Sequence, residues 1–277
     1  MLGKALNALI TLPLVPLRTK IGIRLTTTFL LTAVLVLGIW TFVMAKDHGW
    51  WLPPQHSSYG QAVDNLFYLI LWMVGVFFVL TEGVLVYCVF KYSAKRDTKA
   101  TFTHGNHRLE LLWTFIPALL LLLIAFSQMS TWAEMKFEGG FPKQPPIARV
   151  WASQFDWHFV YPGRDGEFGT SDDLDTAFEF VVPVDEPVVF ELRSRDVIHS
   201  FFVPLFRLKQ DAMPGLSIPV WFKAEKTGVY DLVCAELCGW GHYKMAGRVR
   251  VLSRPDYDKW LEDLEAHHDS NGSEERS

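Results

Sequence analysis

Three long apolar runs in the first half of the chain constrain its fold more than any other feature. They span residues 25–45, 66–90 and 111–133, and the only charged residue within them is Glu82. An α-helix rises about 1.5 Å per residue, so about 20 residues cross the roughly 30 Å hydrocarbon core of a bilayer. A helix buried in a soluble protein needs polar residues on its solvent face, which these runs lack. The sequence therefore predicts membrane-spanning helices, with the Glu82 carboxylate facing protein rather than lipid.

The basic residues around these runs predict how the chain is oriented. Cytoplasmic segments of membrane proteins are enriched in Lys and Arg. Two segments have this enrichment, one before the first run and one between the second and third runs: Lys4, Arg18, Lys20, Arg24, Lys91, Lys95, Arg96, Lys99 and Arg108. We therefore expect a multi-pass protein of a bacterial-type plasma membrane, with residues 46–65 and everything after Glu134 on the exported, periplasmic side.

The first apolar run has two interpretations. The basic segment 1–24 and the ending Val43-Met44-Ala45 resemble a signal peptide with a cleavage site. Residues 25–45, however, are longer than the roughly 7 to 15 apolar residues of a usual signal peptide, which favours a retained helix. Both interpretations leave a transmembrane helical hairpin within residues 46–134, so the membrane part has two or three helices.

The charge of the chain changes sign along its length. Residues 1–138 contain 11 basic and 7 acidic residues, whereas residues 139–277 contain 15 basic and 23 acidic ones, giving net charges of +4 and −8. A mean hydropathy of +0.15 is too high for an ordinary soluble enzyme and too low for a protein lying wholly in the membrane. The chain therefore joins a membrane part to an acidic exported part.

The exported part is expected to be built of β-strands. Its short apolar or alternating stretches are broken by Gly, Pro and Asp, which predicts an antiparallel β-sandwich or barrel of about 110 residues. We expect one domain over residues 135–265, ending in a short helix from Pro255 to Glu265, followed by a disordered tail, 266–277. The predicted strands are 149–161, 177–182, 188–193, 216–224, 228–234 and 247–252.

The densest cluster of reactive side chains is the segment from Cys234 to Met245. Cys234, Cys238, His242 and Met245 form a soft ligand set, which suits copper rather than Mg²⁺ or Ca²⁺. A methionine ligand argues against structural zinc, and three cysteines in the whole chain are too few for an ordinary iron–sulfur cluster. The alternative is a disulfide between Cys234 and Cys238 in the oxidising exported compartment, and it stays open here.

A copper site usually needs a second imidazole, and His199 is the best candidate. It follows the predicted strand 188–193, whereas His158 lies within an aromatic strand and is a weaker candidate. Two cysteines, each able to bridge, favour a pair of copper ions over a mononuclear site. Such a pair suits electron transfer rather than substrate turnover.

The pattern Cys-x-Glu-x-Cys-Gly-x-x-His-x-x-Met, with His199 lying 35 residues before its first cysteine, resembles the CuA domain of cytochrome c oxidase subunit II. The resemblance extends to the segments 196–200 and 209–215 and to the two-helix hairpin. It implies a membrane helical hairpin carrying an all-β, cupredoxin-like Greek-key barrel. It also implies that Cys234 and Cys238 bridge two coppers, and that the site is completed by His199, His242, Met245 and the backbone carbonyl of Glu236.

The same resemblance implies further roles. The Glu236 carboxylate matches a residue that helps to bind Mg²⁺ at the boundary with subunit I, and Glu110 matches a glutamate near the entry of a proton channel. From its position alone, Glu110 is a polar residue at a helix start, where the helix dipole favours an acid. The family's electron-entry tryptophan is replaced by Phe155, which leaves Phe155 and Trp157 as candidates, with Trp240 or Tyr243 as substitutes.

The implied function is electron transfer within a terminal oxidase, where oxygen is reduced to water in a subunit I that carries haem a and CuB. Cytochrome c is the expected donor, and it must be a separate protein because this chain has no Cys-x-x-Cys-His haem motif. Other oxidase subunits are expected partners, and nucleic acid is not. Two alternatives are a copper-free subunit of the quinol-oxidase type and a membrane-anchored copper chaperone or thiol redox protein. The stretch 164–175 is expected to be an acidic surface loop rather than a calcium site.

Overall fold

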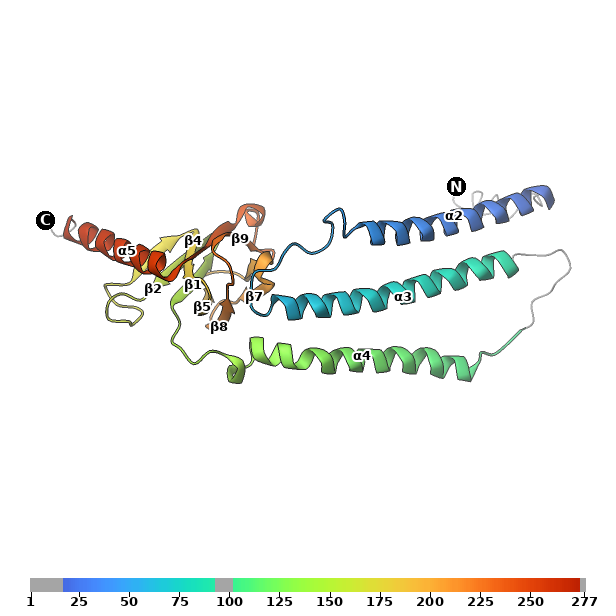
Figure 1. Ribbon diagram of the computed structural model, residues 1–277, viewed down its shortest axis with the longest axis horizontal. Helices are drawn as coiled ribbons and strands as arrows, with labels where there is room; N and C mark the ends of the chain where they lie inside the picture. Colours follow the sequence, from blue (N-terminus) through green and yellow to red (C-terminus); the bar gives the residue numbers. More distant parts are fainter. Residues whose placement is uncertain (1–16, 93–101, 275–277) are drawn as a thin grey trace, which may run out of the picture. The chain divides into compact units, whose positions relative to one another are not determined.

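The computed structural model describes residues 17–92 and 102–274 (Figure 1). The chain divides into two compact units. One contains the first long helix, most of the second and the first part of the third, and the other contains the β-domain together with residues 53–67 and 120–136. The basic stretches that include Lys4, Lys95, Arg96 and Lys99 lie outside the described residues.

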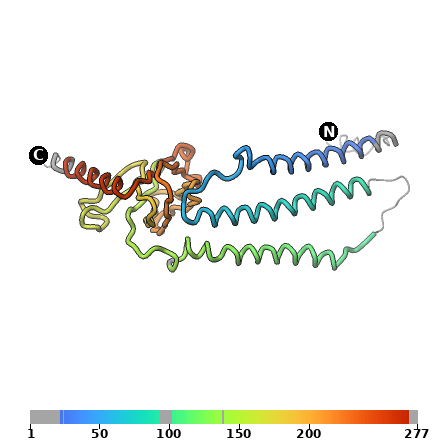
Figure 2. Tube along the Cα trace, viewed as in Figure 1, coloured from blue at the N-terminus to red at the C-terminus, as the bar shows by residue number. Residues whose placement is uncertain are grey.

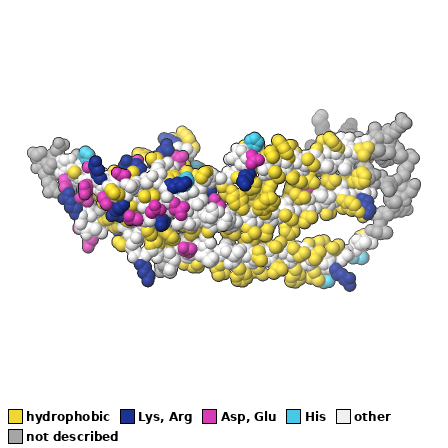
Figure 3. Space-filling view, in the orientation of Figure 1, with side chains coloured by type: hydrophobic (Ala, Val, Ile, Leu, Met, Phe, Trp, Pro, Cys, Tyr) yellow, Lys and Arg dark blue, Asp and Glu magenta, His cyan; other side chains and the backbone are white. Residues whose placement is uncertain are grey.

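The three apolar runs form three long helices: α2 (Leu17–Met44), α3 (Gly60–Tyr92) and α4 (His107–Lys136). All three are long and apolar enough to cross a membrane, and their apolar stretches are not buried within the protein. Figure 3 shows hydrophobic side chains covering these helices, while charged side chains gather on the β-domain. The Asn106 side chain begins α4 by accepting the backbone N–H groups of Arg108 and Leu109.

Ten strands of the described chain form two five-stranded sheets. Figure 2 follows the course of the chain by colour from the first residue to the last. One sheet has the order β3-β2-β1-β5-β8 and the other β4-β10-β9-β6-β7. The strands are β1 (Ala148–Ser153), β2 (Asp156–Tyr161), β3 (Leu174–Ala177), β4 (Glu179–Pro183), β5 (Pro187–Ser194), β6 (His199–Val203), β7 (Leu208–Ala212), β8 (Ile218–Lys223), β9 (Gly228–Cys234) and β10 (Ala246–Leu252). Short 3₁₀ turns, η1 (Glu138–Gly140), η2 (Pro204–Phe206) and η3 (His242–Lys244), lie in the connections.

The strand arrangement confirms the expected β-domain and corrects three details. The stretch expected as one strand, 149–161, is a hairpin of β1 and β2. The sheets are not wholly antiparallel, because β1 pairs with β5 and β4 pairs with β10 in parallel. Parallel neighbours arise where a chain crosses between sheets rather than turning back through a hairpin. Strands β3, β6 and β7 were not expected.

The two sheets enclose an aromatic core. Phe180 stacks on Phe159 with ring centroids 5.0 Å apart and meets Phe190 edge-on at 5.3 Å. These three side chains and those of Trp157 and Phe201 are fully buried. Large aromatic side chains bury much apolar area each, so they stabilise a sandwich of this size. The core thus provides a rigid support for the loops at the ends of the strands.

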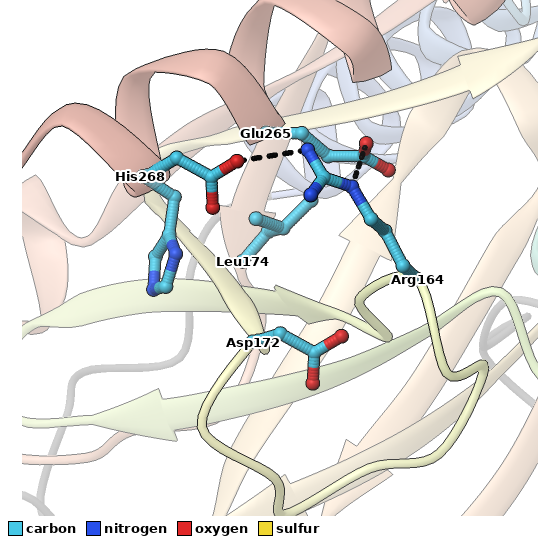
Figure 4. A pocket seen from close by; sticks show the side chains of 6 residues that line it. Arg164, Asp172, Leu174, Glu265 and His268 are labelled. Atoms are coloured by element: carbon cyan, nitrogen blue, oxygen red, sulfur yellow. Dashed lines mark hydrogen bonds and ion pairs between the residues drawn. The ribbon is translucent and has the colours of Figure 1, made fainter. Parts of the chain in front are cut away.

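Helix α5 (Arg254–Glu274) is longer than expected, because it continues beyond Glu265 through the residues expected to be a disordered tail. Its Trp260 ring meets Tyr161 of β2 edge-on at 5.1 Å. Arg164 donates to Glu265 at 3.1 Å and to Asp269 at 2.9 Å, so the 162–173 loop holds the extra turns (Figure 4). These contacts attach the helix to the loop at and just beyond its expected end.

The acidic side chains of the loop 162–173 accept hydrogen bonds from other residues of the same loop. Asp172 accepts the Thr170 hydroxyl at 2.8 Å and the Asp165 backbone N–H at 3.3 Å, while Asp173 accepts the Gly169 backbone N–H at 2.7 Å. Asp165 in turn accepts the Glu167 backbone N–H. The carboxylates therefore serve as turn-forming acceptors, in keeping with an acidic surface loop.

Candidate metal centre

The candidate ligands converge at one end of the sandwich. His199 begins β6 and Cys234 ends β9, and these strands are neighbours in which Phe201 pairs with Cys234. The segment 234–245, here called the ligand loop, connects β9 to β10. The backbone N–H of Cys234 donates to the Met245 carbonyl at 3.1 Å, so the two ends of the ligand loop lie side by side. A loop closed in this way brings Cys234 and Met245 to the same point.

Five side chains meet there at short distances. The two cysteine sulfurs are 3.9 Å apart, and the Cys234 sulfur is also 3.9 Å from His199 Nδ1. His199 Nδ1 is 3.2 Å from the Met245 sulfur, and His242 Nδ1 is 3.6 Å from the Cys238 sulfur. His199, Cys234, Cys238 and Met245 are all buried. The structure therefore brings together every side chain predicted as a copper ligand.

The two thiols are free. A disulfide would bring the sulfurs to about 2.05 Å, far closer than the observed separation. The thiol of Cys234 also lies 3.2 Å from the backbone carbonyl of Glu236. The Glu236 carbonyl therefore lies beside the cysteine sulfurs, whereas the Glu236 side chain is exposed.

The thiols differ in acidity. Burial opposes ionisation of Cys234, but its contacts with His199 and with backbone groups of Glu236 and Ser200 lower its pKa to about 6. Burial and the adjacent Cys234 sulfur raise the pKa of Cys238 to about 11. One thiolate therefore forms readily near neutral pH, and a metal ion would displace the proton of the second.

His199 is held by a carboxylate on its far side. Its Nε2 lies 2.8 Å from Asp196 Oδ1, while Nδ1 faces the sulfurs. Asp196 also accepts the backbone N–H groups of Gln154 at 2.7 Å and Val197 at 2.6 Å. Burial raises the pKa of Asp196, but these hydrogen bonds lower it on balance. A carboxylate bonded to the second ring nitrogen is the usual support for a metal-binding histidine, because it fixes the tautomer and the ring orientation.

The turn between β1 and β2 covers the ligand loop. The Gln154 side chain donates to the Cys238 carbonyl, and the Phe155 ring meets Trp240 edge-on at 5.2 Å. A Cβ at Gly241 would approach the Phe155 ring to 2.5 Å, so a glycine is needed for this contact. Asp196 and Gln154 were not assigned a role from the sequence, although Asp196 lies three residues before His199.

The sequence also indicates His158, Trp157 and Glu110 as candidate residues. His158 contacts the carboxylates of Asp156 at 3.3 Å and Asp175 at 3.6 Å, and it is not one of the five side chains that converge on the cysteine sulfurs. Trp157 is fully buried and its ring centroid lies 6.4 Å from that of His199. Glu110 lies in the first turn of α4, half-exposed and 3.7 Å from His107.

The chemistry of the converging atoms fits copper. Sulfur and imidazole nitrogen predominate, and the potential ligand atoms of His199, Cys234 and Cys238 all lie within 4.8 Å of one another. The Asp196 carboxylate bonds to the back of the His199 imidazole rather than pointing toward the sulfurs. Such a donor set favours a soft, redox-active metal over Mg²⁺ or Ca²⁺.

Comparisons with known proteins agree on one family. Residues 150–251 match the family described as cytochrome C oxidase subunit II, periplasmic domain, and residues 45–130 match its transmembrane domain. The chain is 31% identical to cytochrome c oxidase subunit 2 of Thermostichus vulcanus, over 83% of each protein. It is 28% identical to an alternative cytochrome c oxidase subunit 2 of Bradyrhizobium diazoefficiens, over 83% of this chain and 89% of the relative.

Among solved structures, the chain is similar to the periplasmic domain of subunit II of cytochrome oxidase from Bradyrhizobium japonicum. The two share 29% identity with a TM-score of 0.41, and the match covers 46% of this chain and 98% of the other.

Proposed function

The chain belongs to the cytochrome c oxidase subunit II family, and from this premise we propose that its ligand loop and His199 hold two copper ions. As a member of that family it is a membrane-bound electron-transfer subunit of a haem–copper oxidase. The proposed ligands are His199, Cys234, the Glu236 carbonyl, Cys238, His242 and Met245.

The observation that carries this proposal is the convergence of two unpaired cysteine sulfurs, 3.9 Å apart, with imidazole and thioether groups around them. Two sulfurs at this spacing suit bridging of a metal pair, whereas one sulfur would suit a single ion. When bound, copper supplies one-electron oxidation and reduction. His199 and Cys234 lie at the ends of strands, and a backbone hydrogen bond between Cys234 and Met245 closes the ligand loop, so the ligands need to move little when the charge of the site changes.

The residues around the ligands have distinct tasks. Asp196 fixes the His199 ring with Nδ1 turned inward, and Gln154 holds the Cys238 backbone. The Phe155 ring packs over Gly241 and covers that side of the loop. The buried Met245 thioether offers a weak ligand and adds an apolar wall.

We propose cytochrome c as the donor, docking beside the ligand loop. Trp240 and Tyr243 are 77% and 84% exposed, whereas Trp157 is fully buried and has no surface to offer. Phe155 contacts Trp240, so the two rings form a connection from the surface to the ligand loop. The net charge of −8 on residues 139–277 would attract a basic cytochrome. The electron-entry point is therefore proposed at Phe155 and Trp240.

The remaining proposals concern the partner subunits. Electrons would pass to haem in subunit I, where oxygen is reduced to water. The exposed Glu236 carboxylate is free to take part in a Mg²⁺ site completed by subunit I, since Mg²⁺ prefers oxygen ligands. The half-exposed Glu110 at the start of α4 is available at a proton-channel entry.

Copper content and electron paramagnetic resonance of the purified, detergent-solubilised chain test the proposed function. We expect two coppers per chain sharing one unpaired electron. Cys234→Ser should abolish this signal because it removes one bridge, while Cys88→Ser, which changes the exposed cysteine of α3, should leave it intact. A single localised copper or no copper would contradict the proposal. Those results would instead favour, respectively, a copper carrier and a copper-free subunit of the quinol-oxidase type.

A further inference from the structure

The segment just before α3, residues 53–59, lies against the β-domain and is here called the edge segment. Ser57 is fully buried, donates its hydroxyl to the Phe206 carbonyl at 2.7 Å, and forms a β-bridge with Ala224. His56 donates its backbone N–H to the Leu205 carbonyl at 2.8 Å, and Ser58 donates to Lys223 at 3.1 Å. Leu205 and Phe206 lead into β7, whereas Lys223 ends β8.

These contacts connect the two sheets. Strands β7 and β8 are the edge strands of different sheets. The end of α4 contacts the same two strands, since Lys136 donates to Gln210 of β7 at 2.7 Å and the Trp221 indole of β8 donates to the Glu134 carbonyl at 3.2 Å. Residues at the exported ends of both hairpin helices are therefore attached to one side of the sandwich.

A buried ion pair lies at the centre of this attachment. Arg207 binds Asp64, in the second turn of α3, through two contacts: Nε to Oδ1 at 2.6 Å and Nη2 to Oδ2 at 3.1 Å. The side chains of Arg207 and Asp64 are only 8% and 11% exposed. Two further guanidinium N–H groups donate to the backbone carbonyls of Pro204 and Pro53. A planar guanidinium matches a carboxylate in this two-point geometry, which a lysine cannot reproduce.

The same arginine connects to the metal centre through a short hairpin. Arg207 lies in the turn between β6 and β7, with a left-handed backbone (φ +54°) that ends η2. At the other end of that hairpin, His199 pairs with Ala212. Strand β6 also pairs with β9, which carries Cys234. The Asp64–Arg207 pair therefore holds one end of the β6–β7 hairpin. His199, a proposed copper ligand, lies at the other end.

We propose that Asp64 and Arg207 are positioning residues for electron transfer to the partner subunit. They lock the strands that carry the metal ligands onto the first turns of α3, the helix that continues into the membrane span. This inference rests on the proposed function. The Asp64–Arg207 pair does not contact the proposed copper site. Removing the pair should therefore change the position of the copper centre but not the centre itself.

The test uses the assembled oxidase carrying Arg207→Lys, or the double variant Asp64→Asn with Arg207→Gln, which leaves no unpaired buried charge. Two quantities are measured: the copper resonance signal, and the rate of haem reduction after the copper centre is reduced by a light pulse. We expect an unchanged signal and a haem-reduction rate lowered on the order of tenfold, because shifts of about 1 Å in held reactants have large effects on rate.

The matched control is Arg164→Gln, which removes a two-carboxylate arginine contact between the sandwich and α5. It should leave both quantities unchanged. A wild-type haem-reduction rate in both test variants would overturn the proposal. Loss of the copper signal or of assembly in the double variant, but not in the control, would also overturn the proposal. That result would show that the Asp64–Arg207 pair is required for folding rather than for positioning. If the unaltered oxidase lacked the two-copper signal, the proposed function itself would fail instead.

Discussion

At the scale of single residues, the orientation of His199 depends on a neighbour that is not a ligand. Asp196 accepts from the imidazole and from two backbone N–H groups, so its carboxylate is fixed from three directions. The sequence shows Asp196 three residues before His199, but it does not show that the intervening turn folds the carboxylate back onto Nε2. That contact also needs Gln154, which is distant in sequence and arrives through the β1–β2 turn.

We predict that Asp196→Ala lowers copper affinity by about 10- to 100-fold, because an unsupported imidazole loses its fixed tautomer and orientation. Competition with a copper chelator on the detergent-solubilised chain measures this affinity. Asp231→Ala is the matched control, since Asp231 is exposed and pairs with the exposed Arg248 of the same domain. Equal loss of affinity in both variants would contradict a specific role for Asp196.

At the scale of elements, the sequence predicts strands in which apolar and polar residues alternate regularly, but it does not predict short polar strands. Strands β5, β9 and β10 lie within two residues of their expected bounds. Strand β7 has the sequence LKQDA, whose polar residues give no strand pattern, and it is a strand because β6 pairs with it. Helix α5 likewise extends beyond its apolar residues, and Arg164 of the 162–173 loop binds Glu265 and Asp269 in this region. Tertiary contacts thus override weak local preferences.

We predict that Trp260→Ala lowers the free energy of unfolding of the β-domain by about 2 to 3 kcal/mol, because it removes the indole that packs on Tyr161 and Tyr257. Denaturant unfolding of the solubilised chain measures the change. Lys259→Ala, at the adjacent exposed position of α5, should change stability by less than about 0.5 kcal/mol. A similar small effect for both would show that α5 does not stabilise the sandwich.

At the scale of the whole molecule, hydropathy separates a membrane part from an acidic β-domain. Three described helices are long and apolar enough to span a membrane, and the charged residues concentrate beyond them. The basic link between α3 and α4 predicts that this link faces the cytoplasm and the β-domain faces the exported side.

This orientation can be tested with single cysteines in a Cys88→Ser background, where Cys234 and Cys238 are buried. We predict that a membrane-impermeant thiol reagent labels Lys226→Cys in cells whose inner membrane is intact. Thr103→Cys should be labelled only after that membrane is permeabilised. Labelling of Thr103→Cys in intact cells would contradict the predicted orientation.

The sequence by itself determined the membrane helices, the β-rich character of the second half and the identity of the candidate ligands. It could do so because hydropathy, strand alternation and the spacing of soft ligands are local properties of the chain. The tertiary structure decided the parallel strand pairs, the support of His199 by Asp196, the burial of Trp157 and the pairing of Asp64 with Arg207. Each of these depends on strand crossovers or turns, and the free energy that selects them comes from burying polar and aromatic groups against partners that the folded chain brings into contact.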